Sequence, residues 1–163
     1  TTTFAIASGM WLLVKNPEQM AKVRADRSLL KNMVEEVLRL ESPTQGMPKI
    51  VMEDVELSGI SLPKGAVVHV RYGAANRDPE KFACPHSMDV ARENAGSHMA
   101  FSQSIHSCPG ATLSRVEMLI AFEQLLDRLD DIEFTPGKND FSHAPGMVLR
   151  ALNKLHIRYT ING

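Results

Sequence analysis

Cys108 is the residue of this sequence whose local surroundings are most favourable for a reactive side chain. It comes directly before Pro109 and Gly110, at the end of a long irregular segment and at the expected start of a helix. A thiolate at a helix start meets the positive end of the helix dipole and free backbone N–H groups, and both stabilise the anion. Such a thiolate can act as a metal ligand. The alternative is a buried and inert cysteine, because free cysteines are among the most buried residues of folded proteins.

Histidines around Cys108 raise the alternative of a zinc site. The possible ligands are His98, His106 and Cys108, together with Cys84 or His86. Structural zinc sites usually have pairs of ligands a few residues apart, and the scatter of these five residues fits that pattern poorly. A small zinc-binding protein is therefore a remote alternative.

Glu36 and Arg39 are a charged pair spaced three residues apart on a predicted helix, so they share one face. Such pairs are usually solvated and contribute little to stability. Val37 and Leu38 lie between them, however, and a partly buried pair needs further partners. Arg92, in the irregular segment, is one available cation. The pattern alone leaves both interpretations open.

Apolar periodicity and helix breakers predict the helices that position these residues. We expect helices over 1–16, 17–25, 28–40 and 109–129. Pro17 ends the first helix and begins the second, and Ser28 is the expected cap of the third. The buried face of the last helix is expected to carry Leu113, Val116, Ile120 and Leu126.

Short β-rich runs predict small sheets in two places. Residues 45–72 are expected to form one, and residues 145–161 a terminal β-hairpin with strands at 147–151 and 155–161 joined by a turn at Asn153-Lys154. Residues 73–110 have few periodic runs, and so long an irregular stretch is usually functional or held by a ligand. The predicted fold is mainly α with small β-sheets (α+β), in a single piece over 1–163.

Composition narrows the classes of function. The 163 residues weigh 18.0 kDa, the size of one ordinary domain. The net charge of -1 gives no electrostatic reason to bind nucleic acid, and no apolar run reaches the ~20 residues of a membrane span. Two cysteines without a CxxC pair favour a reducing, cytoplasmic setting. The opening Thr1-Thr2-Thr3 without Met predicts that the chain is a fragment of a longer protein.

Four motifs, taken together, resemble one known family. Phe101–Gly110 resembles the haem-binding loop of cytochrome P-450, Phe-Gly-x-Gly-x-His-x-Cys-x-Gly, and Glu36–Arg39 resembles its Glu-x-x-Arg helix motif. Asn76–Arg92 is similar to the stretch before the loop in bacterial members, and Leu113–Glu117 continues the pattern after the cysteine. The motifs occur in the family's order, so the resemblance covers nearly the whole chain. It implies the C-terminal, proximal half of the cytochrome P-450 fold, with 1–16 as the end of its central helix and 98–110 as its haem-binding loop.

The resemblance implies a role for each matching residue. Cys108 would be the axial thiolate ligand of the iron of haem b, with Phe101 packed beside the sulfur and Gly110 allowing a close approach of the backbone. His106 would bond one haem propionate and Lys49 would pair with another. Thr1 falls where relatives keep a threonine that steers protons to iron-bound oxygen, with its neighbour Thr2 as the alternative. Glu36, Arg39 and Arg92 would form the family's structural charge triad.

Three positions depart from the family pattern. Ser102 and Ser104 replace the two glycines of the loop, and serine costs about 1 kcal/mol or more wherever φ is positive. Met88 stands where phenylalanine is usual, which is a milder change of similar volume. The serines predict a loop that is strained or differently shaped.

The resemblance implies a haem-thiolate monooxygenase that inserts one atom of O₂ into a small organic substrate, with electrons from a ferredoxin or flavodoxin-type donor. Because family members are more than twice as long, the fragment is expected to bind haem weakly and to be inactive alone. The alternative is a non-catalytic haem-binding or interaction module. We also expect self-association through apolar surface around Phe4, Met10 and Trp11.

Overall fold

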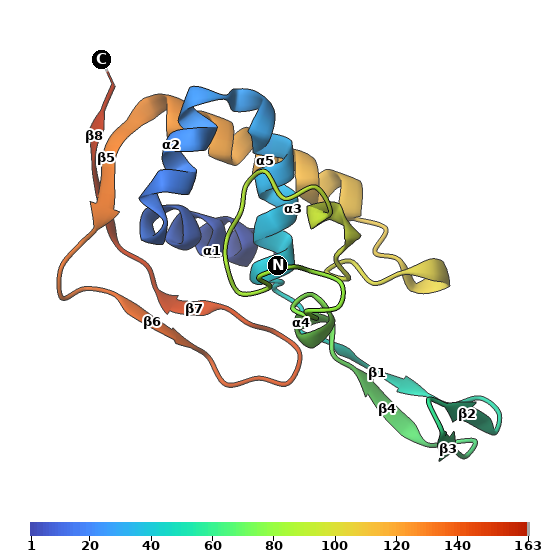
Figure 1. Cartoon of the computed structure of the whole chain (residues 1–163). Helices are drawn as coiled ribbons and strands as arrows, with labels where there is room; N and C mark the ends of the chain where they lie inside the picture. The colour runs from blue at the N-terminus through green and yellow to red at the C-terminus, as the bar shows by residue number, and fades with distance from the viewer. Residues whose placement is uncertain (163) are drawn as a thin grey trace.

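The computed structural model describes residues 1–162 and places helices at the centre of the molecule with small two-stranded sheets around them (Figure 1). The α-helices of this part of the chain are α1 (Thr2–Lys15), α2 (Pro17–Ala25), α3 (Leu30–Leu40), α4 (Tyr72–Ala75) and α5 (Ala111–Arg128). Single 3-10 turns cover Arg27–Leu29, Ala95–Ser97 and Ser104–His106. The strands are β1 (Met47–Ile50), β2 (Val55–Leu57), β3 (Ile60–Leu62), β4 (Val67–Val70), β5 (Leu129–Phe134), β6 (Asp140–His143), β7 (Leu152–Lys154) and β8 (Ile157–Ile161). The mixed helix and small-sheet architecture is the one that the sequence predicts.

The helix starts follow local rules, with one correction. Pro17 is the first residue of α2, and the Asn16 side chain donates a 2.7 Å hydrogen bond to the Leu12 carbonyl, which closes α1. Ser28, however, is not the cap of a helix over 28–40. The Asp26 carboxylate accepts from the Ser28 backbone N–H at 2.9 Å, a 3-10 turn follows, and α3 begins only at Leu30. The ionised carboxylate of Asp26 is a better acceptor for a backbone N–H at this helix start than the hydroxyl of Ser28.

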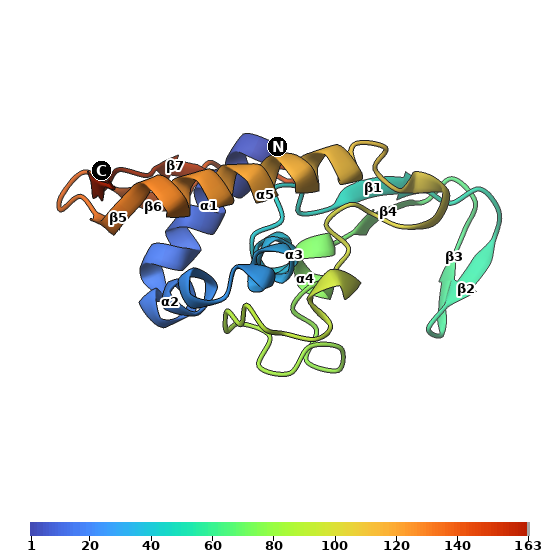
Figure 2. The ribbon, with the colours of Figure 1, turned by 90° about the horizontal axis from the view of Figure 1, so that it is seen from above.

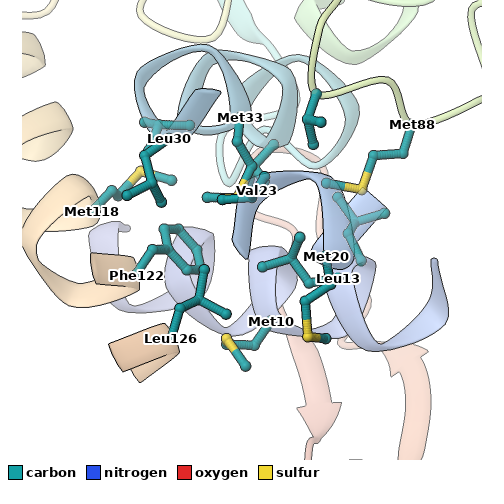
Figure 3. Packing of buried hydrophobic residues seen from close by; sticks show 14 of the residues in the cluster. Met10, Leu13, Met20, Val23, Leu30, Met33, Met88, Met118, Phe122 and Leu126 are labelled. Atoms are coloured by element: carbon teal, nitrogen blue, oxygen red, sulfur yellow. The ribbon is translucent and has the colours of Figure 1, made fainter. Parts of the chain in front are cut away.

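The core lies between α1, α2, α3 and α5 (Figure 3). Its fully buried members include Leu13, Met33, Met118, Phe122 and Leu126. Gly9 allows α1 to approach α5 closely: a Cβ built on Gly9 would lie 2.3 Å from Phe122 Cζ. Any larger residue at position 9 would therefore push the two helices apart.

The buried face of α5 differs from the expectation. Leu126 is buried as expected, but Leu113, Val116 and Ile120 are 62%, 46% and 52% exposed, and Met118 and Phe122 occupy the core. The reason is that α5 carries apolar residues on more than one face, so periodicity could not decide which face meets α1 and α3. In Figure 2, α5 runs along the edge of the molecule with only one side against the other helices.

The apolar side chains of α1 are less exposed than the expected self-association requires. Phe4 is 36% exposed, but Met10 is only 4% exposed and belongs to the core. The Trp11 ring is partly buried, with its centroid 6.2 Å from that of Phe141 on β6. Other exposed large apolar side chains lie on the β1–β4 arm and on α5: Met47, Ile50, Met52, Val55, Leu57, Ile60 and Val67 on the arm, and Leu113, Val116 and Ile120 on α5.

Residues 45–72 form two nested antiparallel hairpins. β1 pairs with β4, with Lys49 opposite Val68, and β2 pairs with β3 at the far end. Gly59 and Gly65 take positive φ values of 78° and 86° at the turns. Figure 1 shows this arm extending away from the helices, so only its base contributes to the site described below.

The C-terminal strands pair differently from the predicted hairpin over 145–161. β8 pairs with β5 and β7 pairs with β6, so neither pairs with the other, and Asn153-Lys154 lies within β7. Residues 147–151 form no strand of their own; Leu149 makes an isolated bridge with Thr44. Local alternation revealed strand character, but it could not reveal partners that lie earlier in the chain.

Candidate functional site

Five of the residues predicted to surround a haem line a single cleft of about 330 Å³ between α1, the base of the β1–β4 arm and the segment before α5. They are Thr1, Lys49, Phe101, His106 and Cys108. These residues come from three separate parts of the sequence, and only the fold brings them together. Gly110 lies beside them, because a Cβ built on it would be 3.8 Å from Cys108 Sγ.

The segment before α5 presents Cys108 at the mouth of this cleft. The Cys108 N–H donates to the Phe101 carbonyl at 2.8 Å, and the Ala111 N–H donates to the Cys108 carbonyl at 3.2 Å. The first bond closes residues 101–108 into a loop, and the second leads into α5. The Cys108 side chain is exposed, so the structure does not support the alternative of a buried, inert cysteine.

Both serines that replace glycine in this loop take left-handed backbone conformations. Ser102 and Ser104 have φ of 60° each, a region that favours glycine. The loop therefore keeps the backbone shape for which glycine is suited, and does so with two residues that strain it.

The two threonines at the start of α1 face different surroundings. Thr1 lines the cleft, whereas the Thr2 hydroxyl lies 3.2 Å from that of Ser114 on α5. Thr1 is accordingly the threonine placed to act on a molecule in the cleft.

Glu36, Arg39 and Arg92 form a buried ionic cluster between α3 and the irregular segment that follows α4. The Arg39 guanidinium donates to both Glu36 oxygens at 2.7 and 2.8 Å, and Arg92 Nε donates to Glu36 at 3.1 Å. The Glu36 and Arg39 side chains have no exposed surface, and Arg92 is 9% exposed. The solvated interpretation of the Glu36–Arg39 pair is therefore wrong.

The same cluster ties the irregular segment to α3. Arg39 also donates to the carbonyls of Asn76 and Pro85 at 2.9 and 2.8 Å, and Arg92 to that of Ala83 at 2.7 Å. Backbone that has no regular secondary structure thus finds its hydrogen-bond partners on buried guanidinium groups. This explains how so long an irregular stretch holds a fixed shape.

A second network, which the sequence did not reveal, fixes Phe101. Arg115 on α5 donates to both oxygens of Glu35 at 2.6 and 2.9 Å, and His98 lies 3.1 Å from the same carboxylate. The Arg115 guanidinium stacks over the Phe101 ring at 4.6 Å. Burial alone would raise the pKa of Glu35, but the hydrogen bonds from His98 and Arg115 and the charge of Arg115 lower it to about 2.

The lowered pKa of Glu35 predicts acid sensitivity. A carboxyl whose pKa in the folded state lies below its ordinary value of 4.5 stabilises the fold above that value, and this contribution is lost as pH falls toward about 2. After a discount for partial solvent exposure, we expect about 2 kcal/mol less stability at pH 2 than at pH 6 from this group. Urea unfolding of Glu35→Gln should show a correspondingly flatter decline. The exposed Glu133→Gln is the control, and an equal decline for all three proteins would contradict the prediction.

Glu41 is the centre of a third network. It is 5% exposed at the end of α3, and it accepts from Arg77 at 3.1 Å and from Arg150 at 2.8 Å. The Arg150 backbone also donates to the Pro43 carbonyl at 2.8 Å. These contacts hold the segment near residue 150 against the end of α3 and against Pro43, which lines the cleft, and no local spacing in the sequence could have indicated them.

The zinc alternative finds no support in this geometry. Within residues 1–162, no group of three His, Cys, Asp or Glu side chains is arranged to hold a metal ion. His98 is engaged with Glu35, and Cys108 and His106 face the cleft separately from Cys84.

Comparison with known proteins decides the family. The family model for cytochrome P450 (P-450) matches residues 1–156. The chain belongs to the cytochrome P-450 family. The P-450 monooxygenase PikC of Streptomyces venezuelae is 40% identical over 160 residues, which is 98% of this chain and 38% of that protein. The 6-deoxyerythronolide B hydroxylase of Saccharopolyspora erythraea is 37% identical over 94% of this chain and 38% of its own length.

A solved P-450 structure agrees with this assignment. The substrate-free form of a Mycobacterium marinum cytochrome P-450 superposes with a TM-score of 0.96 at 36% identity, over 100% of this chain and 42% of that one. This P-450 chain therefore spans about two fifths of the length of the relatives it matches. None of the helices in residues 1–162 has the length and apolar character needed to cross a membrane.

Proposed function

We propose that this chain is the C-terminal, proximal part of a haem-thiolate monooxygenase. The observation that carries the proposal is the cleft in which an exposed Cys108 meets Phe101, His106, Lys49 and Thr1. A soft sulfur ligand suits iron, and a cation at the cleft wall suits the carboxylates at the edge of the porphyrin. The residues present therefore fit haem b.

Each residue has a task toward that cofactor. Cys108 would hold the iron through its thiolate, and Phe101, over which the Arg115 guanidinium stacks, would pack beside the bound group. Lys49 and His106, which line the cleft, would hold the propionates, Lys49 as a point charge. Gly110 keeps the backbone after the ligand free of a side chain. When bound, haem supplies the activation of O₂ and the transfer of one oxygen atom to a small organic substrate.

The remaining roles concern protons and electrons. Thr1 lines the cleft with a hydroxyl that can donate and accept a proton, so it is the residue we assign to proton delivery. Electrons come from a ferredoxin or flavodoxin-type donor. Two free cysteines and no disulfide favour the cytoplasm for this chemistry.

We expect this chain alone not to oxygenate a substrate efficiently, because it matches only 38% of the length of the two curated relatives. The measurement supplies the chain with haem, a ferredoxin, its reductase and NADPH under ¹⁸O₂, and follows labelled product from a panel of small organic molecules by mass spectrometry. Haem alone in the same mixture is the control. Product coupled to NADPH consumption by the chain would contradict this expectation.

The second candidate is a non-catalytic haem-binding or interaction module. The strained backbone of Ser102 and Ser104 favours this candidate, because a loop that takes no part in catalysis does not need the unstrained glycines of the family pattern. Sequencing the DNA upstream of Thr1 separates the two functions. The relatives are longer than this chain. An upstream coding segment that is in frame and about as long as this difference would support the monooxygenase. A stop codon with no such segment would support the module.

A further inference from the structure

The side chains of the two strained serines in the loop differ in their hydrogen bonds. Ser102 Oγ accepts a hydrogen bond from the Tyr72 hydroxyl at 3.1 Å. Within the part of the chain that the structure describes, the Ser104 side chain is exposed and makes no comparable bond. Because both have φ of 60°, they are a matched pair in strain and differ in their side-chain contact.

The Tyr72 side chain is held in place by its surroundings, so its hydrogen bond can restrain Ser102. It is the first residue of α4 and is 3% exposed. The next residue packs so tightly that a Cβ on Gly73 would lie 2.2 Å from Gln45 Oε1, and the Gly73 N–H donates to the Gln45 carbonyl at 3.1 Å. The hydroxyl of Tyr72 is thus held by a packed backbone at the base of the β1–β4 arm.

The other end of the bond lies beside the proposed iron ligand. Ser102 follows Phe101, whose carbonyl accepts from the Cys108 N–H at 2.8 Å. The Ser102 N–H itself donates to the Met99 carbonyl at 2.9 Å. A shift of the backbone at residue 102 would therefore move the carbonyl that holds Cys108.

A buried tyrosine hydroxyl needs a partner, and a glycine at position 102 would leave that of Tyr72 without its acceptor. We propose that Tyr72 is a positioning residue for the haem-binding loop, and that its hydrogen bond to Ser102 stabilises the left-handed turn that sets Phe101 and Cys108 in place. The inference rests on the proposed function only for the cofactor that the loop holds; the coupling of the two side chains is independent of it.

The test is a double-mutant cycle on the unfolding equilibrium of the haem-free chain. Ser104→Gly removes strain alone and should lower the unfolding constant about threefold. Ser102→Gly in the natural sequence should raise it about twofold, because relief of strain is outweighed by the lost bond and the unpaired hydroxyl. In a Tyr72→Phe background, Ser102→Gly should instead lower it about threefold, as Ser104→Gly does. Equal effects of Ser102→Gly in both backgrounds would overturn the proposal.

A second readout separates positioning from stability alone. Haem titration, followed by the absorption of the thiolate complex, should show weaker binding for Tyr72→Phe and Ser102→Gly, and unchanged or tighter binding for Ser104→Gly. Ser102→Asn keeps an acceptor and tolerates the left-handed backbone, so it should restore binding. Equal binding by Ser102→Gly and Ser104→Gly would contradict a positioning role. A natural chain without any thiolate spectrum would count against the proposed function, while the unfolding cycle would still decide the Tyr72–Ser102 coupling.

Discussion

Replacing Arg39 by alanine is expected to cost about 3–5 kcal/mol of the free energy of unfolding, which is most of the stability of an ordinary domain. The substitution leaves the Glu36 carboxylate buried with Arg92 as its remaining cation, at 3.1 Å. It also leaves the carbonyls of Asn76 and Pro85 without their donor. The two carbonyls then bear their desolvation cost without this donor, and the Glu36 carboxylate keeps only part of its compensation, from Arg92 and the Asp89 N–H.

Solubility after expression and chemical unfolding are the measurements for Arg39→Ala. We expect loss of soluble, cooperatively folding protein rather than a change of specificity. Arg158→Ala is the matched control, because its ion pair with Glu133 joins side chains that are 64% and 58% exposed and should contribute about 0–1 kcal/mol. A soluble Arg39→Ala chain with an unfolding midpoint close to that of Arg158→Ala would count against the structural role of the cluster.

Replacing Cys108 by serine is expected to have the second large effect, on cofactor binding. The substitution exchanges a thiolate for a hydroxyl that is a poor ligand for haem iron, while the backbone bond from residue 108 to the Phe101 carbonyl can remain. Loss of partners that only support a metal ligand already weakens binding about 10–100-fold, so loss of the ligand itself should weaken it at least about tenfold.

Haem titration with and without the substitution measures this effect. Cys84→Ser is the control, because Cys84 is the other exposed free cysteine and does not line the cleft. Unfolding of the haem-free Cys108→Ser chain should be nearly unchanged, which separates loss of the ligand from loss of the fold. Equal haem affinity for Cys108→Ser and Cys84→Ser would exclude Cys108 as the ligand.

The sequence predicted those parts of the fold that depend on neighbouring residues. Pro17 set the boundary of α1 and α2 because proline restricts the residue before it. Where partners are distant, prediction failed: the strand at Ile157–Ile161 pairs with Leu129–Phe134, and only the first residue of that partner strand belongs to a predicted element, the helix over 109–129. The core face of α5 was misjudged for a related reason, since Val116 and Met118 are both apolar and only packing against α1 and α3 buries the second.

For the site, a motif could indicate residues but not what holds them. Cys108, His106 and Phe101 followed from the loop pattern, and Lys49 and Thr1 from their places in the resemblance; all five line one cleft. The contacts of Glu35 with Arg115, and of Tyr72 with Ser102, join residues 80 and 30 positions apart. No spacing rule reaches that far, so these supporting contacts became visible only in three dimensions.

Carbon monoxide binding to the reduced, haem-loaded chain tests the central claim most directly, because the position of the Soret band reports the ligand opposite the gas. Protein should be in excess over haem, so that weak binding does not leave free haem in the spectrum. If Cys108 is the axial thiolate, the band of the complex will shift far to the red, and Cys108→Ser will abolish the shift. A chain that binds haem but gives an unshifted band would contradict the assignment of Cys108 as the iron ligand.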